Sequence, residues 1–163
     1  GMVGTEQVYF ATSFLKASGG IEVTASHNPI DYNGMKLVGE GSRPISSDSG
    51  LLEIKDLAEQ NAFADTPAEK RGSYKKLDLL DDYIKCILGY VNIKNLSPLK
   101  VVMNAGNGSA GPIVDILEQY FNQKKIPICI VKINNIPDGS FPNGIPNPIL
   151  KENQKLKIQL LQV

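Results

Sequence analysis

The sequence predicts an α/β protein with mixed sheets and flanking helices, and three observations support this fold class. A strand, a helix and a second strand follow one another over residues 100–131, the order typical of a βαβ unit with a parallel pair of strands. The 163 residues are 42% hydrophobic and 21% charged, the balance of a soluble globular protein. The stretch 65–73 carries Pro67, Gly72 and mixed charges like a linker, so we expect two incomplete domains, over residues 1–72 and 73–163.

The elements expected before the linker are short. Residues 8–12 fit either a strand or the start of a helix, and their type stays open. Residues 21–24 alternate in a β-prone pattern and lead into a polar loop over 25–29. An Asn-Gly turn at Asn33 precedes an extended segment over 35–38. Residues 46–49 can cap a helix that ends near Asn61, with its apolar side made of Leu51, Ile54, Leu57 and Ala58.

Beyond the linker, one apolar stripe predicts a helix over residues 78–91; it consists of Leu80, Ile84, Ile87, Leu88 and Val91. Residues 100–103 and 126–131 read as strands, and the helix between them has Pro112 in its first turn. Four prolines and two glycines over 134–148 exclude regular structure and predict a long shaped loop. The tail over 149–163 looks helical or unsettled, as if the chain stopped within a domain.

Charge and composition exclude several classes of function. Seventeen Lys and Arg balance seventeen Asp and Glu, so no excess positive field exists to gather nucleic acid or an anionic membrane. No apolar run approaches the ~18 residues of a membrane span, and no leader is visible, so we expect a cytoplasmic protein. Cys86 and Cys129 lack the spacing of a zinc or redox site.

The residues around Ser26 are the first candidate site. A serine on a polar loop after a strand can be a nucleophile, but its hydroxyl needs a base or a metal beside it. His27 is the only histidine, and side chains of neighbouring residues in an extended loop point to opposite sides, so we do not expect it to act as a base for Ser26. Thr24, Asn28 and Lys36 are suitable partners for a phosphate. The residues alone leave a phosphoryl carrier and a purely structural loop both open.

A second candidate site is the sequence Gly-Asn-Gly-Ser-Ala-Gly at residues 106–111, which matches the glycine pattern of a dinucleotide-binding turn. The next strand, however, ends without the Asp or Glu that would hold a ribose hydroxyl. We therefore interpret the glycines as a tight strand-to-helix turn. A third possibility is a non-catalytic fragment that binds partner domains through an unfinished, exposed core.

Two motifs carry a resemblance to a known family. Residues 24–29 read Thr-Ala-Ser-His-Asn-Pro, and residues 32–36 read Tyr-Asn-Gly-Met-Lys. Together with residues 137–148, they resemble the α-D-phosphohexomutases, and the flanking residues are most similar to bacterial members that act on mannose phosphates. The resemblance extends from the first residues to about Leu150, and it implies parts of the first and second phosphohexomutase-type domains.

The resemblance implies a phosphoserine at Ser26 that exchanges its phosphoryl group with a hexose phosphate, through a hexose 1,6-bisphosphate that is both intermediate and activator. It also implies that Ser26 contributes to a Mg²⁺ site through its phosphate oxygen. Lys36 resembles the lysine that assists proton transfer, and His27 would orient the substrate. Thr24, Asn28 and Arg43 are then candidates for phosphate or substrate binding.

The chain also departs from the family pattern. The family's Asp-Gly-Asp-x-Asp-Arg motif is not in the sequence, so the expected Mg²⁺ site is incomplete. The start of the first domain and the sugar- and phosphate-binding domains are missing, so the missing domains are the expected partners, and we expect no mutase activity from this chain alone. Mannose phosphate is the expected substrate, with glucose or glucosamine phosphate as the alternatives.

Overall fold

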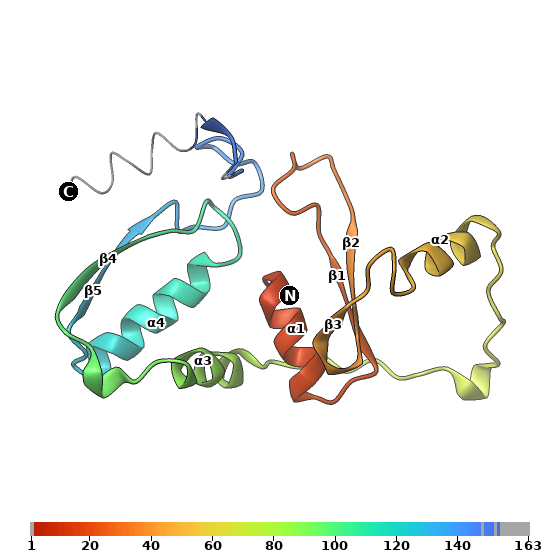
Figure 1. Cartoon of the computed structure of the whole chain (residues 1–163), viewed down its shortest axis with the longest axis horizontal. Coiled ribbons are helices and arrows are strands. Elements are labelled where there is room, and N and C mark those ends of the chain that lie inside the picture. Colours follow the sequence, from red (N-terminus) through yellow and green to blue (C-terminus); the bar gives the residue numbers. More distant parts are fainter. Residues whose placement is uncertain (1, 148, 152, 154–163) are drawn as a thin grey trace. The chain divides into compact units, whose positions relative to one another are not determined.

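The computed structural model describes residues 2–147, 149–151 and 153 (Figure 1). The chain divides into two compact units. The larger unit comprises Gly1–Gly4, Val23–Met35 and Asp82–Val163, and the smaller unit comprises Thr5–Glu22 and Lys36–Asp81. Mixed α and β structure is present in both parts of the chain, as the sequence predicted.

The smaller unit is built on helix α1 (Thr5–Phe14) and a three-stranded sheet in the order β1 (Gly19–Val23), β2 (Met35–Gly39) and β3 (Arg43–Pro44). Strands β2 and β3 are antiparallel. The stretch 8–12, whose type the sequence left open, is helical. Val38 and Thr12 are its most buried side chains, and the hydroxyl of Thr12 donates to the carbonyl oxygen of Val8 at 2.8 Å, which satisfies its polar group inside the core.

Helix α2 (Leu51–Glu59) differs from the expectation in two ways. Its N-cap residue is Gly50, in the left-handed conformation at φ 113°, and no side chain caps the helix. The serine-rich stretch 46–49 instead forms a turn before it, in which the amides of Ser49 and Leu51 donate to the carbonyl oxygen of Ser46. In addition, no residue of α2 is buried, so its apolar side lies exposed.

After α2 the chain runs through residues 60–79 with a single 3-10 turn at Ala68–Lys70. Residues 60–78, which include the expected linker, are all exposed. Helix α3 (Leu80–Gly89) then follows, with Ile84 as its buried residue. The predicted stripe ended at Val91, but the helix ends two residues earlier, and Val91 is 45% exposed.

The βαβ unit of the larger unit is confirmed. Strand β4 (Leu99–Asn104), helix α4 (Gly111–Gln123) and strand β5 (Ile128–Ile133) follow in that order. The two strands are parallel, with Leu99 opposite Ile128 and Asn104 opposite Ile133. Val114 of α4 and Ile130 of β5 are buried, and they form the small core between the helix and the sheet.

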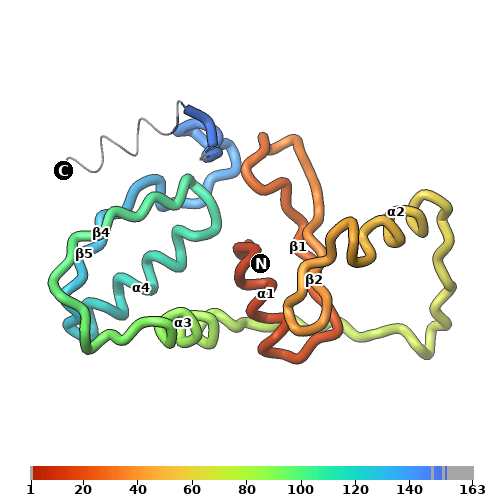
Figure 2. The backbone as a smooth tube through the Cα atoms, viewed as in Figure 1, coloured from red at the N-terminus to blue at the C-terminus, as the bar shows by residue number. Residues whose placement is uncertain are grey.

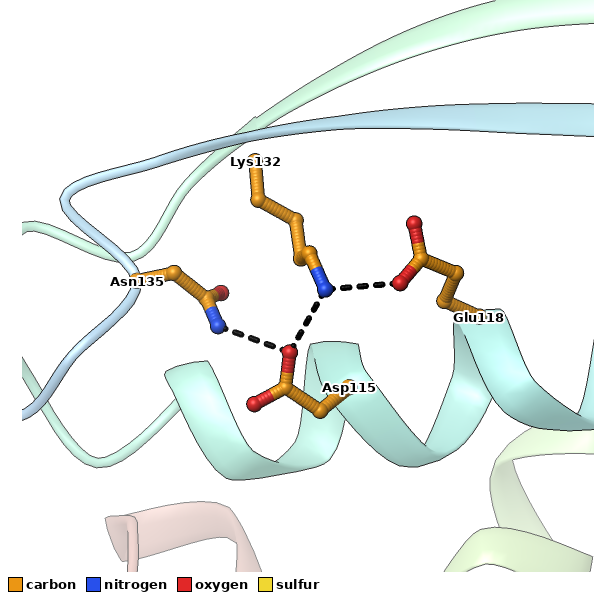
Figure 3. A network of polar contacts seen from close by, with 4 residues as sticks. All are labelled: Asp115, Glu118, Lys132 and Asn135. Atoms are coloured by element: carbon orange, nitrogen blue, oxygen red, sulfur yellow. Dashed lines mark hydrogen bonds and ion pairs between the residues drawn. The ribbon is translucent and has the colours of Figure 1, made fainter.

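A polar network also joins α4 to β5 (Figure 3). The ammonium of Lys132 lies 2.8 Å from Asp115 Oδ1 and 2.6 Å from Glu118 Oε2. The side-chain amide of Asn135 donates to the same Asp115 oxygen at 2.9 Å. The hydrogen bonds that Lys132 donates, to Asp115 first and to Glu118 second, raise its pKa above the ordinary value. The network therefore fixes the end of β5 against the first turns of α4.

Residues 134–147, which we name the proline loop, contain no helix or strand, as predicted for this part of the expected 134–148 loop. Of the expected helical or unsettled tail, residues 152 and 154–163 lie outside the described residues. In the described part of the chain, no helix combines the length and apolar character that a bilayer crossing would need.

Candidate functional site

The candidate site is the loop of residues 24–34 between β1 and β2, which we name the serine loop (Figure 2). At its base, the amide of Thr24 donates to the carbonyl oxygen of Gly34 at 2.9 Å. Two turns follow inside the loop: the amide of Asn28 donates to Ala25 O, and the amide of Tyr32 donates to Pro29 O. Pro29 suits such a turn because its ring fixes φ. The serine loop is thus held by its own backbone.

Ser26 has the left-handed backbone conformation, at φ 59°, and its side chain is exposed. For a residue with a Cβ this conformation costs roughly 1–2 kcal/mol, so other contacts must hold it. One such contact is visible: the amide of Ser26 donates to the hydroxyl oxygen of Thr24 at 3.0 Å. Thr24 therefore acts on the shape of the loop, in addition to the phosphate binding expected of it.

His27 does not lie where the sequence predicted. Its Nδ1 is 3.4 Å from the hydroxyl oxygen of Ser26, so the two side chains lie on the same side of the loop. The prediction of opposite sides assumed an extended backbone, and the left-handed turn at Ser26 reverses that relation. An imidazole nitrogen at this distance can exchange a proton with the hydroxyl after a small movement.

The remaining expected site residues make local contacts. Asn28 is exposed and belongs to the larger unit, with Thr24, Ser26 and His27. Lys36 and Arg43 belong to the smaller unit and are also exposed.

Within the smaller unit, both basic side chains have partners. The ammonium of Lys36 donates to the hydroxyl of Thr5 at 2.9 Å. The Nε of Arg43 donates to the carbonyl oxygen of Glu40 at 3.2 Å. Neither contact is an ion pair, so both positive charges stay available for an anionic ligand.

The residues of this chain do not by themselves fit a Mg²⁺ site. Among the residues that the structure describes, no group of three or more His, Cys, Asp or Glu side chains could hold a metal ion. Mg²⁺ requires several oxygen ligands in near-octahedral geometry, and the hydroxyl of Ser26 supplies one oxygen.

The glycine-rich turn at 106–111 is closed by the chain's own atoms. The amide of Gly106 donates to Asn104 Oδ1, and the amide of Gly108 donates to Ala105 O. A Cβ on Gly111 would lie 1.7 Å from the carbonyl oxygen of Asn135. The proline loop thus packs where a dinucleotide's pyrophosphate would need free amides, and this geometry favours the tight-turn interpretation.

Sequence reasoning missed one residue that organises this region. Asn107 is 8% exposed and has a left-handed backbone at φ 56°. An asparagine between two glycines is a signal for that conformation, because asparagine tolerates it better than most residues. The signal was present in the sequence, but the surrounding glycines were considered only as a possible dinucleotide-binding turn or a tight turn.

Both parts of the chain match domain models of one protein family. Residues 1–65 match the model for phosphoglucomutase/phosphomannomutase, alpha/beta/alpha domain I, and residues 81–162 match the model for alpha/beta/alpha domain II. A phosphomannomutase of Escherichia coli is 57% identical over 152 residues, which are 93% of this chain and 34% of that protein. A protein of Xanthomonas campestris named for phosphohexose mutases is 52% identical over 94% of this chain and 33% of its own length.

A solved structure of a protein from the same family is also similar to this chain. A phosphoglucomutase/phosphomannomutase family protein from Burkholderia thailandensis superposes with a TM-score of 0.76 at 37% identity, over 99% of this chain and 34% of its own. The chain thus spans about a third of the length of the curated relatives it matches.

Proposed function

Because this chain belongs to the phosphoglucomutase/phosphomannomutase family, we propose that it supplies the phosphoryl-carrying part of a phosphomannomutase, with Ser26 as the residue that is phosphorylated. The observation that carries the proposal is the geometry at Ser26, whose exposed hydroxyl is held in a left-handed turn 3.4 Å from an imidazole nitrogen. An exposed hydroxyl beside a nitrogen that can hold its proton is an arrangement that a phosphoryl carrier can use.

The proposed reaction consists of two phosphoryl transfers. In the first, the C1 hydroxyl oxygen of mannose 6-phosphate attacks the phosphorus on Ser26, and the bond from phosphorus to Ser26 Oγ breaks. The proton of the sugar hydroxyl passes to a base, and Ser26 Oγ takes up a proton, which leaves mannose 1,6-bisphosphate. In the second, Ser26 Oγ attacks the phosphorus at C6, loses its proton, and releases mannose 1-phosphate with a proton on O6.

The chain's own residues suggest how protons and charges are handled. The Nδ1 of His27 lies 3.4 Å from Ser26 Oγ, and it can hold the proton that this oxygen gains and loses. Lys36 is the proposed helper in proton transfer at the sugar hydroxyl. Asn28 and Arg43 are proposed to bind phosphate oxygens, since an amide and a guanidinium both donate hydrogen bonds to them.

Several expectations from the resemblance stay predictions. They are the Mg²⁺ that would be held mostly by residues outside this chain, the hexose 1,6-bisphosphate activator, the cytoplasmic location and the need for the remaining domains. Mannose is the proposed sugar because relatives that are 57% identical carry the name phosphomannomutase.

A segment exchange tests the proposal. The 152-residue matching segment of the Escherichia coli phosphomannomutase is replaced by that of this chain, and conversion of mannose 6-phosphate to mannose 1-phosphate is followed by a coupled assay. We expect turnover from the chimera and none from this chain alone. Turnover by the chain alone would contradict the need for the other domains.

Two serine variants make the test specific. Ser26→Ala in the chimera should abolish turnover and the phosphoserine found by mass spectrometry, whereas Ser47→Ala, an exposed serine outside the loop, should preserve both. A chimera that folds and turns over equally well with Ser26→Ala would exclude Ser26 as the carrier.

A further inference from the structure

The shape of the proline loop depends on Asn107. The amide of Asn107 donates to Asn134 O at 2.7 Å, and its carbonyl oxygen accepts from the amide of Asp138 at 2.8 Å. Its side chain donates to Ile136 O at 2.9 Å and accepts from the side chain of Asn143 at 3.0 Å. Four bonds from one buried residue thus reach four points along the loop. Asn107 sets the path of a segment that has no secondary structure of its own.

Two further contacts keep the proline loop against the glycine-rich turn. A Cβ on Gly106 would lie 2.7 Å from Pro146 Cβ, which shows how closely the end of the loop approaches the turn. At its start, Asn135 donates to Asp115 of α4 and lies against Gly111 (Figure 3). The loop is therefore fixed at both ends and along its middle.

The tip of the proline loop contacts the serine loop. A Cβ added to Gly139 would lie 3.2 Å from Ile30 Cδ1 and 3.8 Å from Ile30 Cγ1. Asp138 Oδ1 accepts hydrogen bonds from the amide and the hydroxyl of Ser140, at 2.9 and 2.7 Å, and these bonds fix the turn that presents Gly139. Both loops belong to the larger unit, although they are more than a hundred residues apart in the sequence.

Ile30 lies in the turn closed by Pro29 and Tyr32, and its apolar side chain is 75% exposed. The hydrogen bonds of the serine loop are local, so they fix its internal shape but do not anchor its tip. The contact with Gly139 is such an anchor. It comes from a residue without a side chain, which leaves room for Ile30 to lie directly on the backbone.

We propose that the proline loop is a positioning element for the serine loop: Ile30 rests on Gly139, and Asn107 holds the proline loop in the shape that presents Gly139. The catalytic meaning of this contact rests on the proposed role of Ser26, because in-line phosphoryl transfer depends on where the carrier is held. The contact itself does not depend on that role.

The test on this chain measures amide hydrogen exchange of peptides that cover residues 24–34. Gly139→Val places a branched side chain on Ile30, and we expect exchange in these peptides to become about fivefold faster, as is reasonable for an overpacked contact. In the Gly139→Val chain, Ile30→Ala should restore slow exchange, since it removes the colliding atoms while the valine side chain keeps the two loops in contact. Gly72→Val is the matched control, because its Cβ would meet no atom within 4 Å and should change nothing.

Asn107→Gly tests the other half of the proposal. Glycine keeps the left-handed backbone accessible and removes only the two side-chain bonds, so exchange should rise in both loops. Asn61→Gly is the matched control, a second left-handed asparagine at φ 51°, and should leave the serine loop unchanged. The proposed contact would be refuted if exchange over residues 24–34 stayed unaltered in Gly139→Val or in Asn107→Gly. It would also be refuted if Ile30→Ala failed to reverse the faster exchange caused by Gly139→Val.

Activity of the chimera separates this proposal from the proposed function. Gly139→Val should lower kcat more than it raises KM, and Ile30→Ala should restore it. If the parent chimera turns over substrate and Gly139→Val has no effect on kcat, the positioning role is refuted while Ser26 remains the carrier. If the parent chimera is inactive while exchange responds as expected, the proposed function fails and the contact stands.

Discussion

The replacement of Gly111 by alanine should strongly destabilise the larger unit. A Cβ at this position would lie 1.7 Å from the carbonyl oxygen of Asn135 and 2.8 Å from its carbonyl carbon, both of them backbone atoms. Since non-bonded heavy atoms settle near ~3.5 Å, the strand end or the helix must move by roughly 1.5 Å or more. Asn135 cannot withdraw easily, because its side chain is bonded to Asp115 on the same helix.

The magnitude follows from two opposing effects. Alanine is a better helix former than glycine by up to ~1 kcal/mol, which alone would stabilise α4. Overpacking against a constrained neighbour costs about 1–3 kcal/mol and occasionally more, and a collision with backbone belongs at the upper end. We therefore expect a net loss of roughly 2 kcal/mol or more in the free energy of unfolding.

Urea unfolding measures this loss, followed by far-UV circular dichroism and by tyrosine fluorescence, since the chain has six Tyr and no Trp. Gly89→Ala is the control: Gly89 ends α3, and a Cβ there would meet no atom within 4 Å, so stability should stay equal or rise slightly. A Gly111→Ala chain with the midpoint and slope of the wild type would refute the packing described for the glycine-rich turn.

Three further predictions concern other features. Lys132→Met should lower Tm. Because folding raises the pKa of Lys132 above 10.5, the contribution of its charge to stability is complete below that pH and is lost as pH rises through the folded-state pKa. The Tm difference between the wild type and the variant should therefore shrink above about pH 10.5. Thr24→Val removes the acceptor for the Ser26 amide and should lower kcat of the chimera, whereas Thr24→Ser keeps it; equal kcat for both variants would exclude that role. Titration with NADH should give no saturable change in nucleotide fluorescence, and saturation would reopen the dinucleotide interpretation of residues 106–111.

Much of the fold could be predicted because its elements have strong local patterns. The βαβ unit was readable from two apolar strands around a helix with Pro112 at its start, and the structure confirms it. The type of residues 8–12 was not readable, because alternation and helical spacing cannot be distinguished in so short an apolar run. The end of α3 was predicted too late because Val91 continues the apolar spacing beyond Gly89, where the helix stops.

The candidate site likewise has features that the sequence could predict and features that it could not. The motif around Ser26 could be identified from the sequence, but the approach of His27 could not, because it depends on the sign of φ at a serine. The contact of Ile30 with Gly139 joins two loops that no local pattern relates. The contact depends on the path that Asn107 imposes on the proline loop, and only the structure shows that path.

The contact between the Ile30 side chain and Gly139 has a consequence for how this family can evolve. The contact joins the segment that matches domain I to the segment that matches domain II, across the exposed residues 60–78. Recombination within that stretch would combine a serine loop from one parent with a proline loop from another. A recombinant with incompatible residues at 30 and 139 would lose this contact, so exchange of one segment without the other should disturb the serine loop.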